Sequence, residues 1–265
     1  PAYLACVVCD PVFASPQGFG APAVLLAGYA YAAQIYCDFS GYTDMAIGLA
    51  LLLGYVFPQN FRSPYRATTL ADFWRRWHMT LSRFLRDFLY IPLGGSRGSK
   101  LKTARNLMLT MILGGLWHGA AWGFVLWGTI HGGALVIENV FRERLKWSPP
   151  AWLKWVLVFH IVVLAWIPFR APDLTLAGTF LGRLADWGPA TLWRLPVVLV
   201  IAFVIASQLV PAQPTDAIRV HFENLHPLAP CDRPPVWDVA ATATTPRQAL
   251  HTVPTLRFSG PFTPP

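Results

Sequence analysis

The feature that most constrains this chain is a long run from Asn106 to Ile137 that contains no Asp, Glu, Lys or Arg. As one straight helix at 1.5 Å per residue the run would be ~48 Å long, well beyond a bilayer core of about 30 Å. Gly114, Gly115 and Gly119 lie near its middle. The run therefore predicts two helical segments that bend or break around His118.

His118 is the first titratable side chain inside this apolar run. An ionisable group at membrane depth is costly, and it is read by default as a functional site. Broken backbone at that depth is tolerated where protein buries it or a water-filled cavity adjoins it. We therefore expect a cavity at His118. The alternative is a histidine hydrogen-bonded in a helix interface. His131 is expected to face roughly the other way, and His160 to pack in a plain apolar span.

The composition predicts an integral membrane protein. The chain is 54% hydrophobic and only 13% charged, whereas a soluble domain carries roughly 25% charged residues. Residues 62–105 contain ten Lys and Arg against Asp72 and Asp87, and the remaining charges balance. A short basic connection marks the cytoplasmic side of a membrane protein. That topology explains the charge better than a nucleic-acid patch, so no nucleic-acid partner is expected.

The expected fold is an all-α, polytopic transmembrane bundle in the bacterial inner membrane. Apolar stretches predict spans at residues 21–37, 42–57, 152–169 and 192–210, in addition to the uncharged run. Residues 38–41 are expected to break the first pair of spans. Because the chain opens in mid-hydrophobic sequence, we expect an N-terminally truncated membrane domain over residues 1–210. Residues 211–265 hold eleven prolines, which predicts a mostly disordered tail.

A basic amphipathic segment precedes the uncharged run. Placed on a helix from Asp72, its aromatic and leucine side chains fall on one side and its arginines on the other, with His78 at the edge of the apolar side. The segment is too charged to span, so we expect a helix lying at the cytoplasmic interface. It should end at residues 91–95, where a proline and two glycines follow one another.

Three stretches resemble the membrane-bound O-acyltransferase family, and in particular its bacterial alginate O-acetyltransferase branch, with the D-alanyl transfer protein of teichoic-acid modification as a cousin. They fall within residues 34–140 and read IYCDFSGYTDMAIGLALLLGY, PQNFRSPYRATTLADFWRRWHMTLSRFLRDFLYIPLGG and GGLWHGAAWGFVLWGTIHG. The resemblance implies a multi-helix membrane domain with a tunnel or funnel through it. It also implies a catalytic histidine at the WHG position, here His118, and an upstream polar partner, here His78. The departures from the family are the missing N-terminal helices and a tail unlike a final membrane helix.

The expected chemistry is acyl transfer to a hydroxyl. A neutral imidazole suits removal of the hydroxyl proton, so His118 is the candidate general base. His78 is the candidate that orients the acceptor or polarises the acyl carbonyl. Its alternative role is packing at the edge of an amphipathic helix under the lipid headgroups.

Four arginines, Arg75, Arg76, Arg83 and Arg86, could hold the phosphates of an acyl donor such as acetyl-CoA. The equal alternative is ordinary interfacial arginine near anionic lipid. No tightly bound cofactor and no metal site is expected, since neither histidine has a nearby Cys or Glu to complete one.

The function expected is a membrane O-acyltransferase that moves an acyl group, most simply acetyl, from a cytosolic thioester towards hydroxyls of an extracellular polysaccharide such as alginate. The expected partners are membrane lipids, the thioester donor, and the polysaccharide or a periplasmic acyl-transfer protein. A proton-relaying transporter or an inactive scaffold of a polysaccharide-modifying complex are the alternatives.

Overall fold

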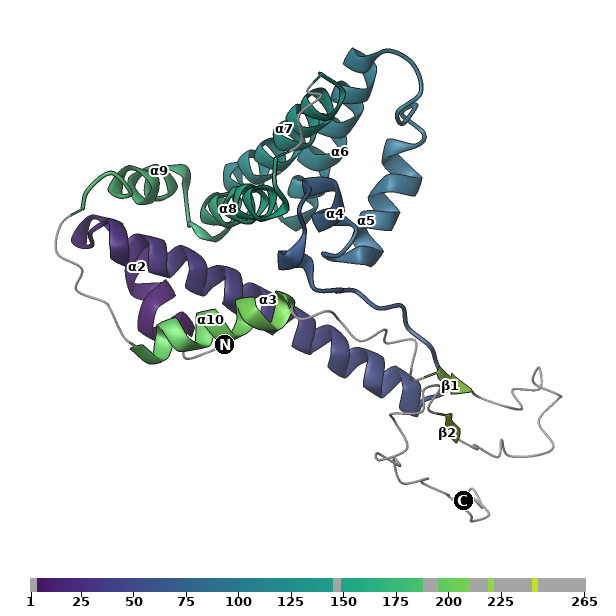
Figure 1. Cartoon of the computed structure of the whole chain (residues 1–265), viewed down its shortest axis with the longest axis horizontal. Coiled ribbons are helices and arrows are strands. Elements are labelled where there is room, and N and C mark those ends of the chain that lie inside the picture. The colour runs from purple at the N-terminus through teal and green to yellow at the C-terminus, as the bar shows by residue number, and fades with distance from the viewer. Residues whose placement is uncertain (1–3, 145–148, 188–194, 210–218, 222–239, 243–265) are drawn as a thin grey trace. The chain divides into compact units, whose positions relative to one another are not determined.

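The computed structural model describes residues 4–144, 149–187, 195–209, 219–221 and 240–242 (Figure 1). The chain divides into two compact units, Pro1–Val210 and Pro211–Pro265. The described elements of the first unit are helical: η1 Ala5–Cys9, α2 Asp10–Ala14, η2 Pro16–Gly18, α3 Ala21–Leu52, η3 Pro64–Arg66, α4 Leu70–Trp74, α5 Met79–Leu85, η4 Arg86–Tyr90, α6 Lys100–His118, α7 Trp122–Arg144, α8 Ala151–Arg170, α9 Leu174–Arg183 and α10 Leu195–Leu209.

The second unit contains two short strands that the sequence does not predict. Strand β1, Arg219–His221, pairs antiparallel with β2, Ala240–Thr242, so that Val220 lies opposite Ala241. The rest of the tail, for which disorder is predicted, lies outside the described residues.

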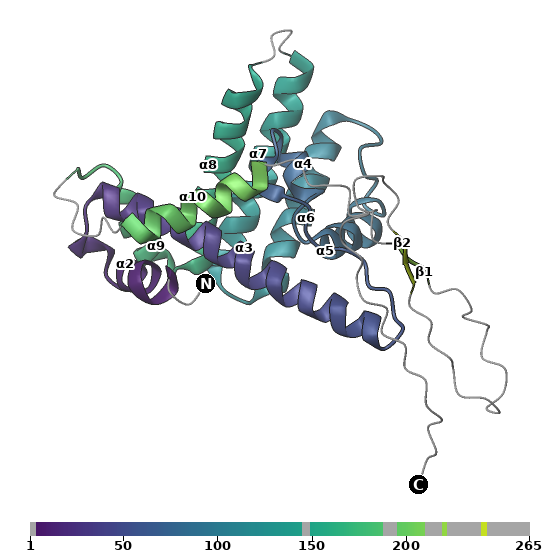
Figure 2. The same ribbon diagram turned by 60° about the horizontal axis from the view of Figure 1, so that its bottom comes forward.

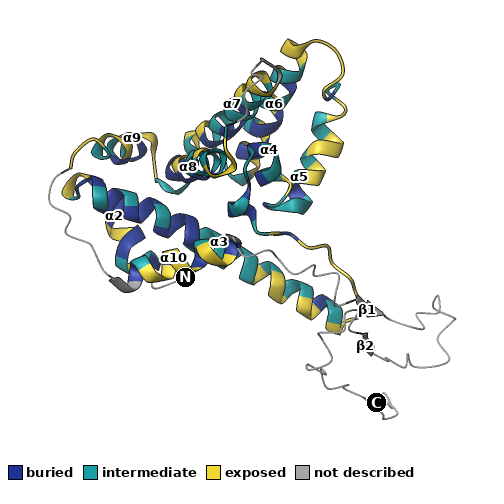
Figure 3. Cartoon of the chain, viewed as in Figure 1, coloured by how far each residue is buried: buried dark blue, intermediate teal, exposed yellow. Residues whose placement is uncertain are grey.

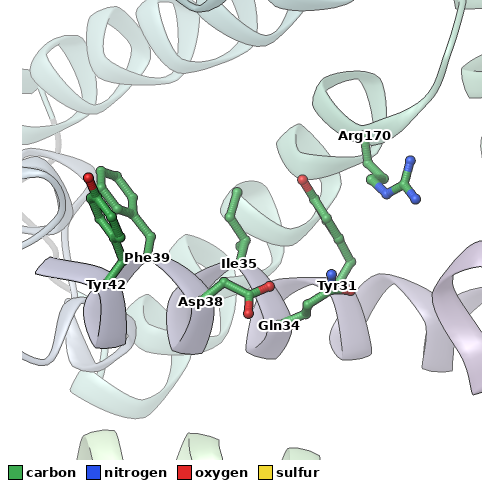
Figure 4. A pocket seen from close by; sticks show the side chains of 7 residues that line it. All are labelled: Tyr31, Gln34, Ile35, Asp38, Phe39, Tyr42 and Arg170. Atoms are coloured by element: carbon green, nitrogen blue, oxygen red, sulfur yellow. The ribbon is translucent and has the colours of Figure 1, made fainter. Parts of the chain in front are cut away.

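Helix α3 is continuous, and the break predicted at residues 38–41 is wrong. The hydroxyl of Thr43 donates back to the carbonyls of Phe39 and Ser40, so it bonds within the helix. The side chain of Asp38 caps no helix and instead lines a groove (Figure 4). The first half of α3 is mostly buried, whereas the second half alternates between partly buried and exposed residues (Figure 3).

The predicted break at His118 is confirmed. Helix α6 ends at His118, Gly119 follows as its C-cap, and α7 begins at Trp122. Figures 1 and 2 show α6 and α7 side by side. A Cβ at Gly115 would overlap the carbonyl oxygen of Phe124, and one at Gly128 would overlap that of Met111. The backbones of the two helices therefore touch, as small residues allow in membrane helix pairs.

Two described helices are long and apolar enough to cross a membrane: residues Trp122–Arg142 of α7 and Ala151–Arg170, which is α8. The second coincides with the span predicted at residues 152–169. Helix α10 occupies the span predicted at 192–210, but it has 15 residues and is shorter than a full crossing. The number of crossings stays a prediction. Helix α9 is one that the sequence pattern does not predict.

The single amphipathic helix predicted from Asp72 to about residue 90 is wrong, because the chain turns at His78. Helix α4 ends at Trp74 and α5 begins at Met79, and His78 between them has φ 42° and ψ 56°, the left-handed conformation. Two parts of that prediction are confirmed. Asp72 lies in the first turn of α4, and the helical path that continues through η4 ends at Ile91.

Hydrogen bonds fix the segment that leads into α4 to three longer helices. The hydroxyl of Tyr65 donates to the carbonyl of Ala32 in α3 at 2.7 Å, and its own carbonyl accepts from the Trp155 indole of α8 at 2.7 Å. The amide of Leu70 donates to the Glu138 carboxylate of α7 at 2.5 Å. The chain just before the His78 turn is therefore held by hydrogen bonds to α3, α7 and α8.

We expect Gly128→Ala to destabilise the protein, because the new methyl group must displace the backbone of α6 from α7. Overpacking of this kind costs about 1–3 kcal/mol. The unfolding temperature in detergent should fall. Gly133→Ala on the same helix is the matched control, since a Cβ there meets nothing within 4 Å, and Ala favours the helix over Gly by about 1 kcal/mol. Equal unfolding temperatures for the two variants would contradict the close contact.

Candidate active site

His118 is held by its own helix and surrounded by aromatic rings. Its Nδ1 lies 2.8 Å from the carbonyl oxygen of Gly114, one turn earlier in α6. The imidazole is half-buried. Four rings lie around it, with centroids 5.1–6.2 Å away: Trp117, Phe124, Trp127 and Phe169. The Nε2 atom makes no hydrogen bond among the described residues.

His78 is held by Asn60, a residue that the sequence did not single out. The Asn60 side-chain oxygen lies 3.2 Å from His78 Nδ1 and also accepts from the amide and the hydroxyl of Thr80, at 3.2 and 2.9 Å. The Asn60 carbonyl accepts from the Met79 amide at 2.9 Å. Asn60 is buried, with 8% of its surface exposed. These bonds stabilise the left-handed backbone at His78, a conformation that costs a non-glycine residue about 1–3 kcal/mol.

The indole of Trp117 connects the two histidines. Its ring centroid lies 6.2 Å from that of His78 and 5.1 Å from that of His118, and both pairs of rings are arranged edge to face. Phe39 of α3 covers His78 from another side at 4.7 Å. The structure therefore brings the two predicted site histidines to one aromatic wall, although they come from different elements 40 residues apart in the sequence.

The pKa of His78, which lies in the turn outside the membrane-crossing helices, is lowered to about 4. Burial is the main cause, because it disfavours the charged imidazolium, and the nearby His118 adds repulsion. His78 therefore stays neutral at physiological pH.

His131 lies behind this wall and does not belong to it. It is fully buried, in ring contact with Trp74 at 5.0 Å and Trp127 at 4.9 Å, and neither of its nitrogens has a partner among the described residues. Trp127 separates it from His118. His160 is satisfied, since its Nδ1 bonds the Val156 carbonyl and its Nε2 bonds the Tyr29 hydroxyl.

A groove of about 480 Å³ lies along α3, and neither histidine is among its lining residues, so the cavity predicted at His118 stays a prediction (Figure 4). Phe39, which lines the groove, contacts His78, and Arg170, which also lines it, directly follows Phe169 at the His118 wall. Its lining mixes aromatic rings with charged and amide groups: Tyr31, Gln34, Ile35, Asp38, Phe39, Tyr42 and Arg170. Arg170 also pairs with Asp10 at 2.7 Å.

The four candidate donor-binding arginines differ in their contacts. Arg76 pairs with Asp72 at 2.8 Å, and Arg86 pairs with Asp87 at 2.7 Å. Arg75 and Arg83 are exposed and make no hydrogen bond or ion pair with any described residue. A phosphate would therefore meet Arg75 without competition from a carboxylate, whereas Arg83 lies within electrostatic range of the Asp87 carboxylate. Within the described residues, no three His, Cys, Asp or Glu side chains gather as metal ligands.

Comparison with known proteins places these residues in a family. The model of "MBOAT, membrane-bound O-acyltransferase family" matches residues 20–170, a range that includes both histidines, Asn60 and the four arginines. The chain is 47% identical over 184 residues to the "Probable alginate O-acetylase AlgI" of Azotobacter vinelandii, a match that covers 69% of this chain and 37% of that protein.

Two further relatives carry other names. The "Peptidoglycan O-acetyltransferase" of Helicobacter pylori is 49% identical over 150 residues, covering 56% of this chain and 28% of the relative. The "Teichoic acid D-alanyltransferase" of Bacillus subtilis is 32% identical over 150 residues, covering 52% of this chain and 37% of the relative. The chain thus spans about a third of the length of these curated relatives.

The low pKa of His78 predicts an acid-sensitive contribution to stability. Its folded-state pKa of about 4 lies below the ordinary value of 6.5, so the unfolded chain binds the proton more readily. The contribution is fully present above about pH 6.5 and is lost as the pH falls towards 4. Unfolding temperatures in detergent between pH 4 and 8 should therefore fall more steeply for the native chain than for His78→Gln. Parallel curves would contradict the burial of a neutral imidazole.

Proposed function

Because this chain belongs to the membrane-bound O-acyltransferase family, we propose that it carries the catalytic centre of an O-acyltransferase. The enzyme takes an acyl group, acetyl in the simplest case, from a cytosolic thioester such as acetyl-CoA. It passes that group towards hydroxyls of an extracellular polysaccharide such as alginate, directly or through a periplasmic acyl-transfer protein. The names of the relatives support transfer to cell-surface polymers. The match to an alginate O-acetylase covers 69% of this chain, against 56% for the peptidoglycan relative, and this longer match favours alginate among them.

His118 is the proposed general base, and its hydrogen bond to Gly114 is the observation that carries the proposal. A backbone carbonyl only accepts, so the Nδ1 atom at 2.8 Å from it must carry the proton. The neutral ring then has its lone pair on Nε2. Partial burial among aromatic rings disfavours the imidazolium, which keeps this lone pair available.

The reaction then balances with one histidine. Nε2 of His118 takes the proton of the acceptor hydroxyl as its oxygen forms a bond with the thioester carbonyl carbon. The carbon–sulfur bond breaks as the carbonyl re-forms, and the leaving thiolate recovers the proton from the imidazolium. No other proton donor or acceptor is required.

The chain itself contains an example of the hydroxyl contact. His160 has the same arrangement as His118, with Nδ1 on a carbonyl one turn earlier at 2.7 Å, and its Nε2 lies 2.7 Å from the Tyr29 hydroxyl. A substrate hydroxyl on His118 Nε2 would reproduce that geometry. The groove lined by Gln34, Asp38 and Arg170 is the proposed approach to the two histidines.

We expect His118→Ala to lower acyl transfer by about 10²- to 10⁴-fold, the range that a positioned general base contributes. The assay follows label from acetyl-CoA into polymer in membranes that contain the protein. His160→Gln is the matched control, because it changes a histidine of the same local geometry outside the site. Full transfer by His118→Ala would exclude this mechanism. Movement of label across the membrane with no acylated product would favour the transporter alternative.

We expect the double variant Arg75→Gln, Arg83→Gln to raise KM for the thioester about two- to tenfold with little change in kcat. Each exposed charge pair is worth about 0.2–1 kcal/mol and is screened by salt, so KM of the unaltered protein should also rise with ionic strength. Arg97→Gln, another exposed cation in the same basic region, is the control. An unchanged KM together with weaker binding to anionic lipid would instead favour the lipid role.

A further inference from the structure

We propose that Asn60 is the positioning residue of His78, and that it holds this histidine as a hydrogen-bond acceptor rather than a donor. This inference rests on the proposed function for its catalytic consequence, whereas the protonation pattern itself follows from the hydrogen bonds. It assigns to His78 one of the two roles that the sequence left open: orienting the acceptor hydroxyl, and not polarising the acyl carbonyl.

The orientation of the Asn60 amide is fixed by a backbone donor. The Thr80 amide can only donate, so the Asn60 atom that it meets at 3.2 Å must be the carbonyl oxygen and not the NH₂ group. The same oxygen faces His78 Nδ1 at 3.2 Å. Since that oxygen cannot donate, Nδ1 must carry the ring proton for the contact to be a hydrogen bond.

The hydroxyl of Thr80 is the one group that could reverse this assignment, because it lies 3.4 Å from His78 Nδ1. It has a single proton, and its contact with the Asn60 oxygen is shorter, at 2.9 Å. With the proton on that shorter bond, the hydroxyl offers only lone pairs to His78. The Nδ1–H group then points between two acceptor oxygens, one from Asn60 and one from Thr80.

The consequence is that Nε2 of His78 has a lone pair and no proton. At a pKa of about 4 the ring gains no second proton at physiological pH. It therefore cannot donate to the oxyanion that forms on the acyl carbonyl. It can accept from a hydroxyl, as His160 accepts from Tyr29. Both histidines at the Trp117 wall then present acceptors, which fits a polyhydroxylated acceptor that offers more than one O–H group.

The direct test is ¹⁵N NMR of the protein labelled at histidine, in lipid, with the His78 signals identified by their loss in His78→Gln. The expected pattern is a protonated Nδ1 and an unprotonated Nε2. Asn60→Leu should release the ring to the other tautomer or a mixture of both. Asn60→Asp retains the acceptor oxygen and should retain the Nδ1–H tautomer.

Thr80→Val separates the two readings of the Thr80 contact. If Asn60 sets the tautomer, the variant leaves the His78 spectrum unchanged. If Thr80 donates to His78, the spectrum of the unaltered chain shows protonated Nε2, and the valine alters it. The second result would overturn the proposal.

Transfer assays on the same variants give an independent readout. We expect Asn60→Leu to lower kcat by at least about tenfold, since His78 would no longer orient the acceptor hydroxyl and a misplacement of about 1 Å can cost about 10²-fold. Asn60→Asp should restore activity and move the acid limb of the pH profile upward, because the carboxylate favours the imidazolium.

If neither the unaltered protein nor any variant transfers acyl groups, the proposed function fails while the NMR result stands. If the unaltered protein transfers acyl groups but Nε2 of His78 carries the proton, only the Asn60 proposal is contradicted.

Discussion

The close contact between α6 and α7 is the constraint on which the rest of the first unit depends. Small residues at a helix interface let two backbones approach closely, so packing along the pair holds the two helices together. Glycines at 115 and 128 let the backbones touch, and the chain must turn back within the three residues between His118 and Trp122. That turn places His118 at a helix end, where its Nδ1 bonds the Gly114 carbonyl of its own helix while its ring also contacts side chains of α7 and α8.

A second constraint, of polar origin, completes the site. The left-handed turn at His78 is held from outside its own helices, by the side chain and the carbonyl of Asn60. The segment carrying that turn is in turn bonded to α3, α7 and α8 through Tyr65 and Leu70. Apolar packing fixes one histidine and a hydrogen-bond cluster fixes the other, so the two can be altered separately.

How much of this the sequence could predict follows from the range of the interactions involved. The break at His118 was predictable because length, glycine content and the absence of charge are local properties of one run. The turn at His78 was not, since the segment has a regular amphipathic pattern and Asn60 overrides it from 18 residues away. At residues 38–41 the prediction fails in the opposite way. Residue types that often cap helices predict a break there, but they lie inside the continuous helix α3. The role of Asn60 has no sequence signal other than its being a polar residue between an apolar span and a basic segment.

The most direct test of the central claim is the position of the acceptor relative to His118. In a cryo-electron microscopy structure of the protein with a non-transferable acetyl-CoA analogue and a short alginate oligosaccharide, one sugar hydroxyl should lie about 2.6–3.2 Å from His118 Nε2. The acyl carbonyl should lie beside that hydroxyl. An oligosaccharide and a thioester that meet elsewhere, with the His118 ring still enclosed by aromatic side chains, would contradict the claim.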